Sequence, residues 1–428
     1  MSFLSRILGF LGMDSDLHRQ LVRNTVFLIG SEAVIKIIVA VLAIFIARHL
    51  GTLGYGELQF AIAFAAMFQF ALDLGFNGLM VREIAADYRS ARKYAENVLT
   101  LRIILALLCY AVLAMLVFFI NKPLEIKWLV LLAGVQLVFI TLMDFCSALF
   151  QAFDKVYLRA AMRLLYHVVL VSACLYVFLS KGGVQQFMYA YVLSACVAFL
   201  VAFFVAQAKF TRFVLGFDFG FWKKIFVEML PFASIAILAT MYNRVDMVML
   251  SFMKGEEAVG IYAAAFNVYS AFQLMPVLAI TAGYASLARL FRYGSQGFRH
   301  LVRQYFWWLL CAGVAGAVLL FLIANPLVRL VYGEVFAASG AVLQVFGICL
   351  LTGTLIYFLS TYCIISRMQK KYVRILFMAL LLNICLNYVL IGKFSYLGAV
   401  VATFVAQLYQ VVMLIAVSYF SGQRVWAR

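Results

Sequence analysis

Charged residues are scarce in this chain. Only 12% of its 428 residues are Asp, Glu, Lys or Arg, whereas 67% are hydrophobic. Soluble domains are about 25% charged and about 45–50% apolar, so this composition excludes a soluble enzyme. A disordered chain needs low hydrophobicity and is excluded for the opposite reason. The remaining class is a protein that crosses a membrane several times.

A strict alternation of apolar and polar residues is also missing. Strands of outer-membrane barrels alternate in this way over about ten positions. Here the apolar runs are continuous, as at Ile37–Ala47, Ile103–Ile120 and Gly398–Val417. A segment in lipid must satisfy its own backbone hydrogen bonds, so such runs indicate helices. The expected fold class is an all-α polytopic membrane protein.

Sequence patterns of metal and nucleotide sites are absent. The eight cysteines form no CxxC pair, and the four histidines are scattered. Cysteines in apolar runs are expected to act as small buried hydrophobes. No Walker A pattern occurs. We therefore expect no metal and no cofactor. No cleavable signal peptide is recognised either, and residues 1–20 resemble an amphipathic interfacial segment.

Twelve apolar segments are long enough to cross a bilayer. We predict spans near 24–47, 56–81, 98–120, 127–150, 160–180, 184–208, 225–251, 257–287, 303–324, 334–364, 372–391 and 396–420. The connections between them are short and leave no room for an extramembrane catalytic domain. An enzyme is therefore not expected, and an oligosaccharide polymerase or ligase with a large outside loop does not fit.

The net charge of +17 comes from 34 Lys and Arg against 17 Asp and Glu. With the N-terminus inside, strongly and weakly basic loops alternate along the chain, and Arg102 is assigned to a strongly basic one. Cytoplasmic loops collect Lys and Arg, so both termini are predicted to be cytoplasmic in a bacterial inner membrane. No compact basic domain remains for nucleic acid.

Two related halves are visible along the chain. Leu53-Gly54-Tyr55-Gly56 before the second span matches Val259-Gly260-Ile261-Tyr262 before the eighth. Asn121-Lys122-Pro123-Leu124 matches Asn325-Pro326-Leu327 at nearly the same offset. We predict two parallel six-helix bundles, 1–210 and 211–428. Such a repeat is typical of transporters with a substrate site between the halves.

Ionisable residues inside the spans are the informative positions, because a charge at a helix centre costs about 2.5–3.5 kcal/mol on insertion scales. Glu32 and Lys36 share one helix face and either neutralise each other or line a cavity. Arg244 either faces that cavity or locks the halves through an interhelical ion pair. At i, i+2, Arg244 and Asp246 point to different faces. Asp73 and Asp144 are candidates for coupling-ion carboxylates or for helix–helix hydrogen bonds.

Polar amides add to these charges within the predicted spans. Some are expected to line a hydrophilic cavity and others to join helices. They are Asn24, Asn243, Asn267, Gln273, Asn383, Asn387 and Gln407.

Several motifs in order resemble the Wzx-type polysaccharide-unit flippases of the MATE-like MOP exporter superfamily. The resemblance covers essentially the whole chain. It is carried by Ala47–Gly56 running into Phe60–Phe64, Asp73-Leu74-Gly75, Arg82 with Ile84-Ala85, Arg244-Val245-Asp246, Val259–Ala264, and Pro326-Leu327 with Val331-Tyr332-Gly333.

This resemblance implies a V-shaped pair of six-helix bundles that works by alternating access. The implied cargo is an oligosaccharide linked to undecaprenyl diphosphate, moved from the cytoplasmic to the periplasmic leaflet. Lys36 and Arg244 would supply one cation from each half for the diphosphate. Arg48 and Arg82, within the motifs, are further candidates for this site.

If transport is coupled to a proton or sodium gradient, the candidate carboxylates are Glu32, Asp73, Asp246 and Asp144. The expected partners besides the cargo are membrane lipids and a polysaccharide polymerase or ligase. A MATE-type cation-coupled multidrug exporter is the alternative function, although it favours an acidic cavity. A major-facilitator transporter is disfavoured, because its loop motif is missing at Gly78–Asp87.

Overall fold

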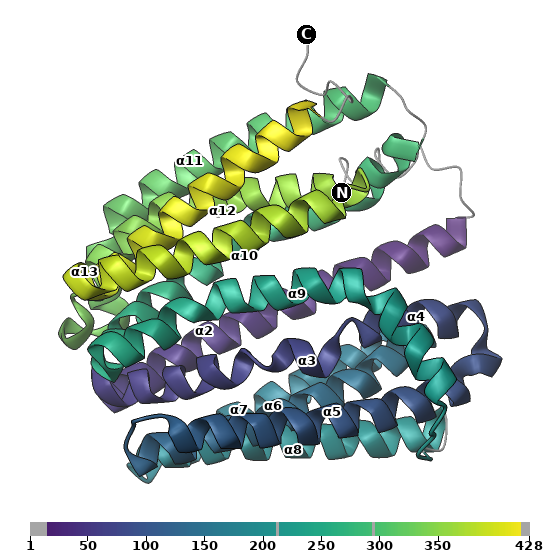
Figure 1. Ribbon diagram of the computed structural model, residues 1–428, viewed down its shortest axis with the longest axis horizontal. Coiled ribbons are helices and arrows are strands. Elements are labelled where there is room, and N and C mark those ends of the chain that lie inside the picture. Colours follow the sequence, from purple (N-terminus) through teal and green to yellow (C-terminus); the bar gives the residue numbers. More distant parts are fainter. Residues whose placement is uncertain (1–14, 211–213, 293–295, 421–428) are drawn as a thin grey trace.

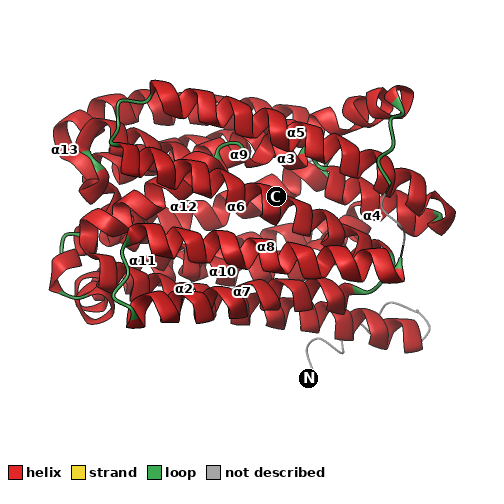
Figure 2. Ribbon diagram, turned by 90° about the horizontal axis from the view of Figure 1, so that it is seen from below, coloured by secondary structure: helices red, strands yellow, loops and turns green. Residues whose placement is uncertain are grey.

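The computed structural model describes residues 15–210, 214–292 and 296–420, with side chains from Ile35 onward except at 230–232, 282, 284–286, 288–290, 292, 296–299 and 420. All regular secondary structure in these ranges is helical (Figure 2). The elements are α2 (Ser15–Ala66), α3 (Gln69–Asp73), α4 (Phe76–Ala86), η1 (Tyr88–Ser90), α5 (Ala91–Phe119), α6 (Leu124–Ala152), α7 (Val156–Leu179), α8 (Val184–Lys209), α9 (Phe219–Lys254), α10 (Glu256–Arg292), α11 (Gln296–Tyr332), η2 (Glu334–Phe336), α12 (Ser339–Ile365) and α13 (Gln369–Phe420).

Ten of the described helices are long and apolar enough to cross a membrane. Two of them, α2 and α13, are interrupted by non-helical backbone at Gly51 and Ser395. Gly51 has φ 69°, a left-handed conformation that glycine adopts without a steric cost. Each bent helix therefore holds two segments, so the ten helices supply twelve segments. The predicted fold class, an all-α polytopic membrane protein, is confirmed.

The second predicted span, 56–81, is not a single helix. It is broken into the end of α2, then α3, then α4, with left-handed residues Leu74 (φ 43°) and Gly75 (φ 89°) at the last break. Gly75 tolerates this conformation because it has no Cβ. The break leaves Asp73 at the end of α3, where its side chain meets α5.

The helices form two groups with α2 and α9 between them (Figure 1). Helices α5–α8 lie on one side and α10–α13 on the other. α9 contacts α3 and α5 as well as α13, and α2 contacts both α6 and α10, so these two helices join the groups. The predicted boundary at 210/211 adjoins residues 211–213, which lie outside the described residues, and it stays a prediction.

The molecule has a kinked end, where helices bend or turn back, and a basic end, where Lys and Arg gather. The kinked end holds Gly51, Gly255 and Ser395, where the backbone turns. The basic end holds Arg82, Arg92, Lys93 and the α6–α7 connection at Asp154-Lys155. Figure 1 shows the two groups of ribbons meeting at the kinked end and diverging toward the basic end.

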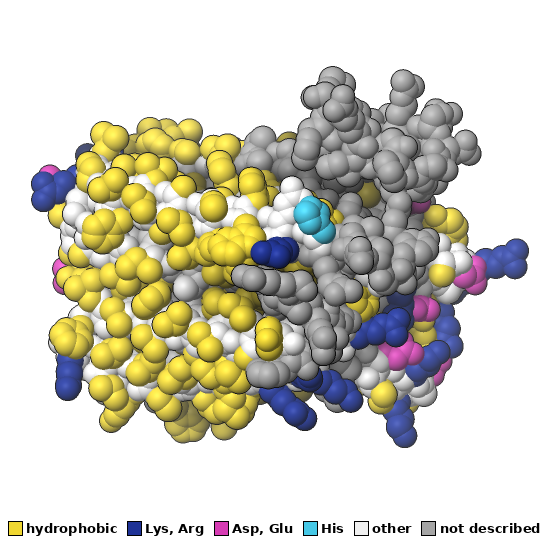
Figure 3. Space-filling model, turned by 90° about the horizontal axis from the view of Figure 1, so that it is seen from above, with side chains coloured by type: hydrophobic (Ala, Val, Ile, Leu, Met, Phe, Trp, Pro, Cys, Tyr) yellow, Lys and Arg dark blue, Asp and Glu magenta, His cyan; other side chains and the backbone are white. Residues whose placement is uncertain are grey.

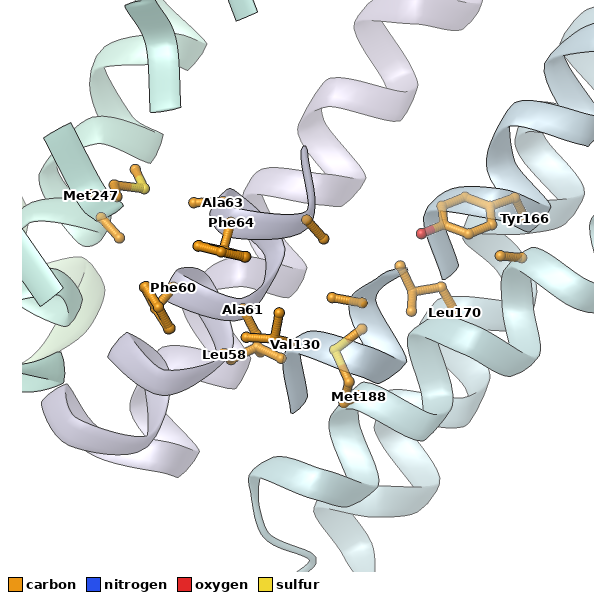
Figure 4. Close-up of a cluster of buried hydrophobic side chains, with 14 of the residues drawn as sticks. Leu58, Phe60, Ala61, Ala63, Phe64, Val130, Tyr166, Leu170, Met188 and Met247 are labelled. Carbon is orange, nitrogen blue, oxygen red and sulfur yellow. The ribbon is translucent and has the colours of Figure 1, made fainter. Parts of the chain in front are cut away.

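One large apolar core runs from the first group of helices into the second. It includes Phe60 and Phe64 of α2, Met188 of α8 and Met247 of α9, all buried (Figure 4). Along α8 the fully buried Ala198, Ala202 and Ala206 repeat at i, i+4. Small residues at this spacing let helices pack closely in lipid, where burial of apolar surface drives association little.

The outer face of the bundle is apolar. Figure 3 shows hydrophobic side chains spread over this face, with most of the Lys, Arg, Asp and Glu at its two ends. Large apolar side chains such as Leu107, Phe118 and Leu330 are 67%, 78% and 76% exposed. A soluble monomer rarely exposes a continuous apolar surface of this kind, whereas lipid tails cover it at no cost.

Candidate functional site

A cavity of about 200 Å³ opens within the second group of helices, between α9, α10, α12 and α13. Its walls combine tyrosines, amides and hydroxyls, among them Tyr242, Asn243, Tyr269, Gln273, Tyr357, Thr403, Gln407 and Gln410. Asn243, Gln273 and Gln407 are polar span residues of the kind expected to line a cavity, and this expectation is confirmed for them. Asn267 instead donates to Tyr55 of α2 at 2.6 Å and joins α10 to α2.

Asp246 is the acidic residue of this cavity and is only 4% exposed. One carboxylate oxygen accepts from the Tyr262 hydroxyl at 2.8 Å and from the Thr403 hydroxyl. The other accepts from Asn387 Nδ2 at 2.6 Å. No Lys or Arg among the described residues pairs with this carboxylate. Neutral donors alone therefore surround a buried acid, an arrangement that favours either a bound proton or a bound cation.

Further oxygen atoms lie beside this carboxylate. Asn387 also donates to Asn383 Oδ1 at 3.0 Å, which places the two amides of α13 in line, and both residues are fully buried. Asn387 Oδ1 has no hydrogen-bond partner among the described residues. Carboxylate, amide and hydroxyl oxygens are the ligands that hard cations prefer. Asp246, Asn387 and Thr403 are therefore the residues able to hold such an ion.

Arg244 lies two residues before Asp246 on α9 and is partly buried. The carboxylate of Asp246 bonds to α10 and α13, and no ion pair joins it to Arg244 among the described residues. That the two side chains point apart stays a prediction. Among the described residues no acid pairs with Arg244. An arginine inside a span without a counter-charge is costly, so it is typical of a substrate pathway.

Lys36 lies on α2 and is exposed, between buried Ile35 and exposed Ile37. Its expected neighbour Glu32 is on the same helix, but the side chain of Glu32 lies outside the described residues. No hydrogen bond or ion pair joins Lys36 to Arg244 in the described part of the chain, although α2 and α9 pack together. Their shared role stays a prediction.

Arg48 and Arg82 lie at opposite ends of the molecule, away from Arg244. Arg48 donates to the carbonyl oxygens of Leu330 and Val331 at 2.5 and 2.7 Å, at the end of α11. Arg82 pairs with Glu83 at 2.7 Å and with Glu228 of α9 at 3.3 Å. Arg48 therefore links α2 to α11, and Arg82 links α4 to α9. The structure does not bring them together with Lys36.

Asp73 and Asp144 lie in the first group of helices. Asp73 accepts from Arg102 at 2.6 Å, and this arginine also donates to Asn77 Oδ1 and to the Thr141 carbonyl oxygen. Arg102 is 1% exposed, so its assignment to a cytoplasmic loop is wrong. Asp144 lines a second cavity together with Arg159 and Arg163. The sequence pattern missed Arg102 because it stands at the start of a long apolar run.

Comparison with known proteins identifies the family. The family described as "Polysaccharide biosynthesis protein" matches residues 21–291, more than half of the chain, and the MatE family matches residues 231–389. No curated protein matches the sequence.

Solved structures with the same fold are transporters and flippases. One is described as the lipid II flippase MurJ in an inward closed conformation, with a TM-score of 0.76 and 12% identity, covering 92% of this chain and 87% of that one. Another is an inward-facing multidrug resistance MATE transporter of the MOP superfamily, with a TM-score of 0.73 and 14% identity, covering 91% and 100%. A third is the MATE multidrug transporter DinF-BH in complex with R6G, with a TM-score of 0.69 and 14% identity, covering 95% and 96%.

The twelve apolar segments, the polar cavity with its buried acid and the family match agree with the resemblance that the motifs carry. The chain belongs to the polysaccharide biosynthesis protein family, within the MATE-like MOP superfamily of membrane transporters and flippases.

Proposed function

We propose that this protein moves an oligosaccharide linked to undecaprenyl diphosphate from the cytoplasmic to the periplasmic leaflet of a bacterial inner membrane. The observation that carries the proposal is Arg244, a partly buried arginine within a span that pairs with no acid of the described residues. A diphosphate is the counter-charge that such an arginine fits, since a guanidinium binds phosphate oxygens in a bidentate manner. Lys36 would add a second cation from the other half.

The tyrosine-lined cavity, whose wall includes Asn243, the residue before Arg244 in the chain, suits the sugar part of this cargo. Its tyrosine rings offer flat apolar faces, and Gln273, Gln407 and Gln410 offer amide donors and acceptors for hydroxyl groups. Among the described residues that line it, none is Lys or Arg. In this proposal the basic end faces the cytoplasm, in accord with the positive-inside rule. A polysaccharide polymerase or ligase would then use the exported unit.

Asp246 is the proposed site of the coupling ion, a proton or Na⁺. Support comes from its burial, from the neutral donors around it and from the unpartnered Asn387 oxygen. Binding of a cation there would replace hydrogen bonds from Thr403 and Asn387 that now join α9 to α13. Occupancy would therefore change how these helices pack, which is the requirement for coupling.

A cation-coupled multidrug exporter is the second candidate function. The specific observation in its favour is that the MatE match, residues 231–389, includes Asp246 and most of the tyrosine-lined cavity. A buried acid among aromatic rings attracts organic cations. The unpaired Arg244 argues against this candidate, because it repels such a substrate.

The test uses purified protein in liposomes with a fluorescent undecaprenyl-diphosphate oligosaccharide. The accessible fraction of lipid is measured in each leaflet for the wild type, Lys36→Ala and Arg244→Ala, with Lys393→Ala as the matched control for loss of an exposed cation. We expect the control to transfer the lipid as fast as the wild type. The other two variants should transfer it about tenfold more slowly, or slower still, because each loses a charge-assisted phosphate contact.

Thermal unfolding midpoints show whether each variant is folded. Absence of transfer by the wild type under an imposed proton or sodium gradient, together with efflux of a cationic dye, would replace the flippase assignment with the exporter. Equal transfer by Arg244→Ala and the wild type would remove the arginine from the diphosphate site.

A further inference from the structure

A second cavity, of about 320 Å³, lies in the first group of helices, apart from the tyrosine-lined one. Its walls come from α4, the last turns of α6 and the first turns of α7. It opens near the α6–α7 connection, at the basic end. This volume is about ten times the share of one water molecule in the liquid, so the cavity holds a group of several heavy atoms.

The cavity is rich in hydrogen-bond donors. Arg159 and Arg163 stand one helical turn apart on α7 and both line it. Arg159 donates to Gln151 Oε1, and Arg102 donates to Asn77 Oδ1 at 2.9 Å. Since both amide oxygens are used by arginines, the amide NH₂ groups of Gln151 and Asn77 are the parts turned to other partners.

One lining group is buried without a partner. Ser147 is 3% exposed, and its hydroxyl makes no hydrogen bond to any described residue. A hydroxyl this deeply buried normally has a hydrogen-bond partner, so Ser147 contributes an unused donor to the wall of this cavity. Across the cavity, a Cβ added at Gly78 would meet nothing within 4 Å, which leaves the opposite wall clear.

Asp144 is the acceptor among these donors. Its carboxylate interacts electrostatically with Arg163, Arg102 and Arg159 and with Asp73. These three arginines outnumber the two aspartates, so the cluster keeps a positive balance. Asp144 repels a fully ionised anion but accepts a hydrogen bond from one that still carries a proton. A phosphomonoester, with a second pKa of about 6, still carries that proton in roughly a quarter of its molecules at pH 6.5, whereas sulfate and phosphodiesters carry none.

We propose that this cavity binds a protonated phosphate group, either inorganic phosphate or the headgroup of a phosphomonoester lipid. Arg159, Arg163 and Ser147 donate to the phosphate oxygens, and Asp144 accepts the phosphate proton. This site is separate from Arg244, and its occupancy does not depend on which cargo the protein moves.

The experiment uses the full chain in a neutral detergent at pH 6.5. Isothermal titration with inorganic phosphate and with sulfate is carried out on the wild type, on the double variant Arg159→Gln/Arg163→Gln, on Ser147→Ala and on Asp144→Asn. Lys155→Gln removes a neighbouring exposed cation outside the cavity, and Arg244→Gln removes the central one. Unfolding midpoints without ligand establish that each variant is folded.

We expect phosphate to bind the wild type at least about tenfold more tightly than sulfate. The double variant should lose about tenfold or more in phosphate affinity and Ser147→Ala about threefold, while Lys155→Gln keeps wild-type affinity. Asp144→Asn should bind sulfate as well as phosphate. Competition by dihexanoyl phosphatidic acid, with none by dihexanoyl phosphatidylglycerol, would identify a lipid headgroup as the source. If phosphatidic acid does not compete either, the ligand is free phosphate.

Two results would overturn the proposal. One is unchanged phosphate affinity in the folded double variant or in Ser147→Ala. The other is equal binding of sulfate and phosphate by the wild type, since Asp144 would then accept no proton. If affinity fell only in Arg244→Gln, the phosphate would belong to the central cation instead.

Discussion

Individual charged residues inside this membrane protein are accommodated in different ways. Arg102 is fully buried and has a carboxylate, an amide oxygen and a backbone carbonyl as acceptors. Asp246 is buried among neutral donors. Arg244 has no acidic partner among the described residues. A buried ion is tolerated when it is paired and hydrogen-bonded, so Arg102 has a structural role. In the described part of the chain, Asp246 and Arg244 lack an opposite charge and are suited to bind a charged ligand.

Substitution of Arg102 should destabilise the fold strongly. Arg102→Ala leaves Asp73 and Asn77 without their donor and empties space between the rings of Phe76 and Phe145. Because the Asp73 side chain is 42% exposed, water relieves part of the loss, and we expect about 3 kcal/mol, at the low end for a broken buried pair. Thermal and denaturant unfolding in detergent measure this effect. Arg92→Ala, which removes an exposed arginine, should leave the midpoint unchanged, and equal midpoints for both variants would contradict the structural role of Arg102.

Substitution of Asp246 should separate folding from ion binding. Asn has the same shape without the charge, so Asp246→Asn should fold and keep hydrogen bonds with Thr403 and Asn387. If Na⁺ binds at this position, wild-type stability rises with [Na⁺] by mass action, by about 2.7 kcal/mol at a hundredfold excess over Kd, and the variant loses that rise. Unfolding midpoints in NaCl and in choline chloride, and at several pH values, provide the measurement. Asp154→Asn, in the α6–α7 connection, is the control. Identical salt and pH responses in all three proteins would exclude Asp246 as the ion site.

At the scale of elements, α2 and α10 cross with their backbones in contact. A Cβ added at Gly56 would overlap the carbonyl oxygen of Glu256, and one added at Gly260 would overlap that of Thr52. Both glycines stand in the two motifs that repeat along the chain. Backbone contact between helices requires small residues on both partners, so these glycines set the distance between the halves at the kinked end.

Alanine at this crossing should push the helices apart. Gly260→Ala has no flexible side chain opposite it to move away, because the obstructing atoms are backbone. We expect the unfolding midpoint to fall by several degrees, about the effect of 1–3 kcal/mol of overpacking. Gly392→Ala is the matched control at the same end, since its Cβ would meet nothing within 4 Å. A Gly260→Ala protein as stable as the control would show that the crossing is not tight.

At the scale of the whole molecule, polar contacts hold the kinked end together. Lys122, just after α5, donates to Glu256 at 2.6 Å and to the Ser251 carbonyl oxygen at 2.8 Å, and its side chain is only 11% exposed. Arg48 reaches the last carbonyl oxygens of α11. At the basic end the cross-contacts run to the start of α9, as in the pairs Arg82–Glu228 and Lys93–Asp218. The polar contacts at the kinked end therefore reach helices of the second group, whereas those at the basic end reach α9 and the residue before it.

Removal of the Lys122 contact should shift the molecule toward opening at the kinked end. Lys122→Met deletes a partly desolvated charged hydrogen bond, worth about 2 kcal/mol, which is roughly a thirtyfold change in the ratio of the two states. Spin labels at Leu53→Cys on α2 and Val335→Cys on η2, exposed sites in opposite halves of the sequence, report the separation in a background without native cysteines. A longer-distance population should appear in Lys122→Met and be absent in Lys127→Ala, whose nitrogen bonds to Phe118 of its own group. Identical distance distributions would mean that Lys122 does not hold this end.

Sequence alone was sufficient for the properties that depend on composition and periodicity. Continuous apolar runs cannot remain in water, and in lipid they must be helical, so the all-α membrane fold and its twelve segments follow from the residues. The two glycine motifs showed the internal repeat. Polar residues inside spans, such as Asn243 and Gln407, predicted a hydrophilic cavity because unpaired polar groups in lipid are costly.

The tertiary structure decided which of these polar residues meet. Asp246 lies on α9, Tyr262 on α10, and Asn387 and Thr403 on α13, so their contact depends on how helices distant in sequence are packed. Arg102 was misplaced in a loop because the break at Leu74-Gly75, which turns Asp73 toward it, is not evident from hydrophobicity. Hydrophobicity determines that a segment enters the membrane. Only the packing of the helices determines which of its charges are neutralised there and which, like Arg244, have no counter-charge in the described part of the chain and can bind a ligand.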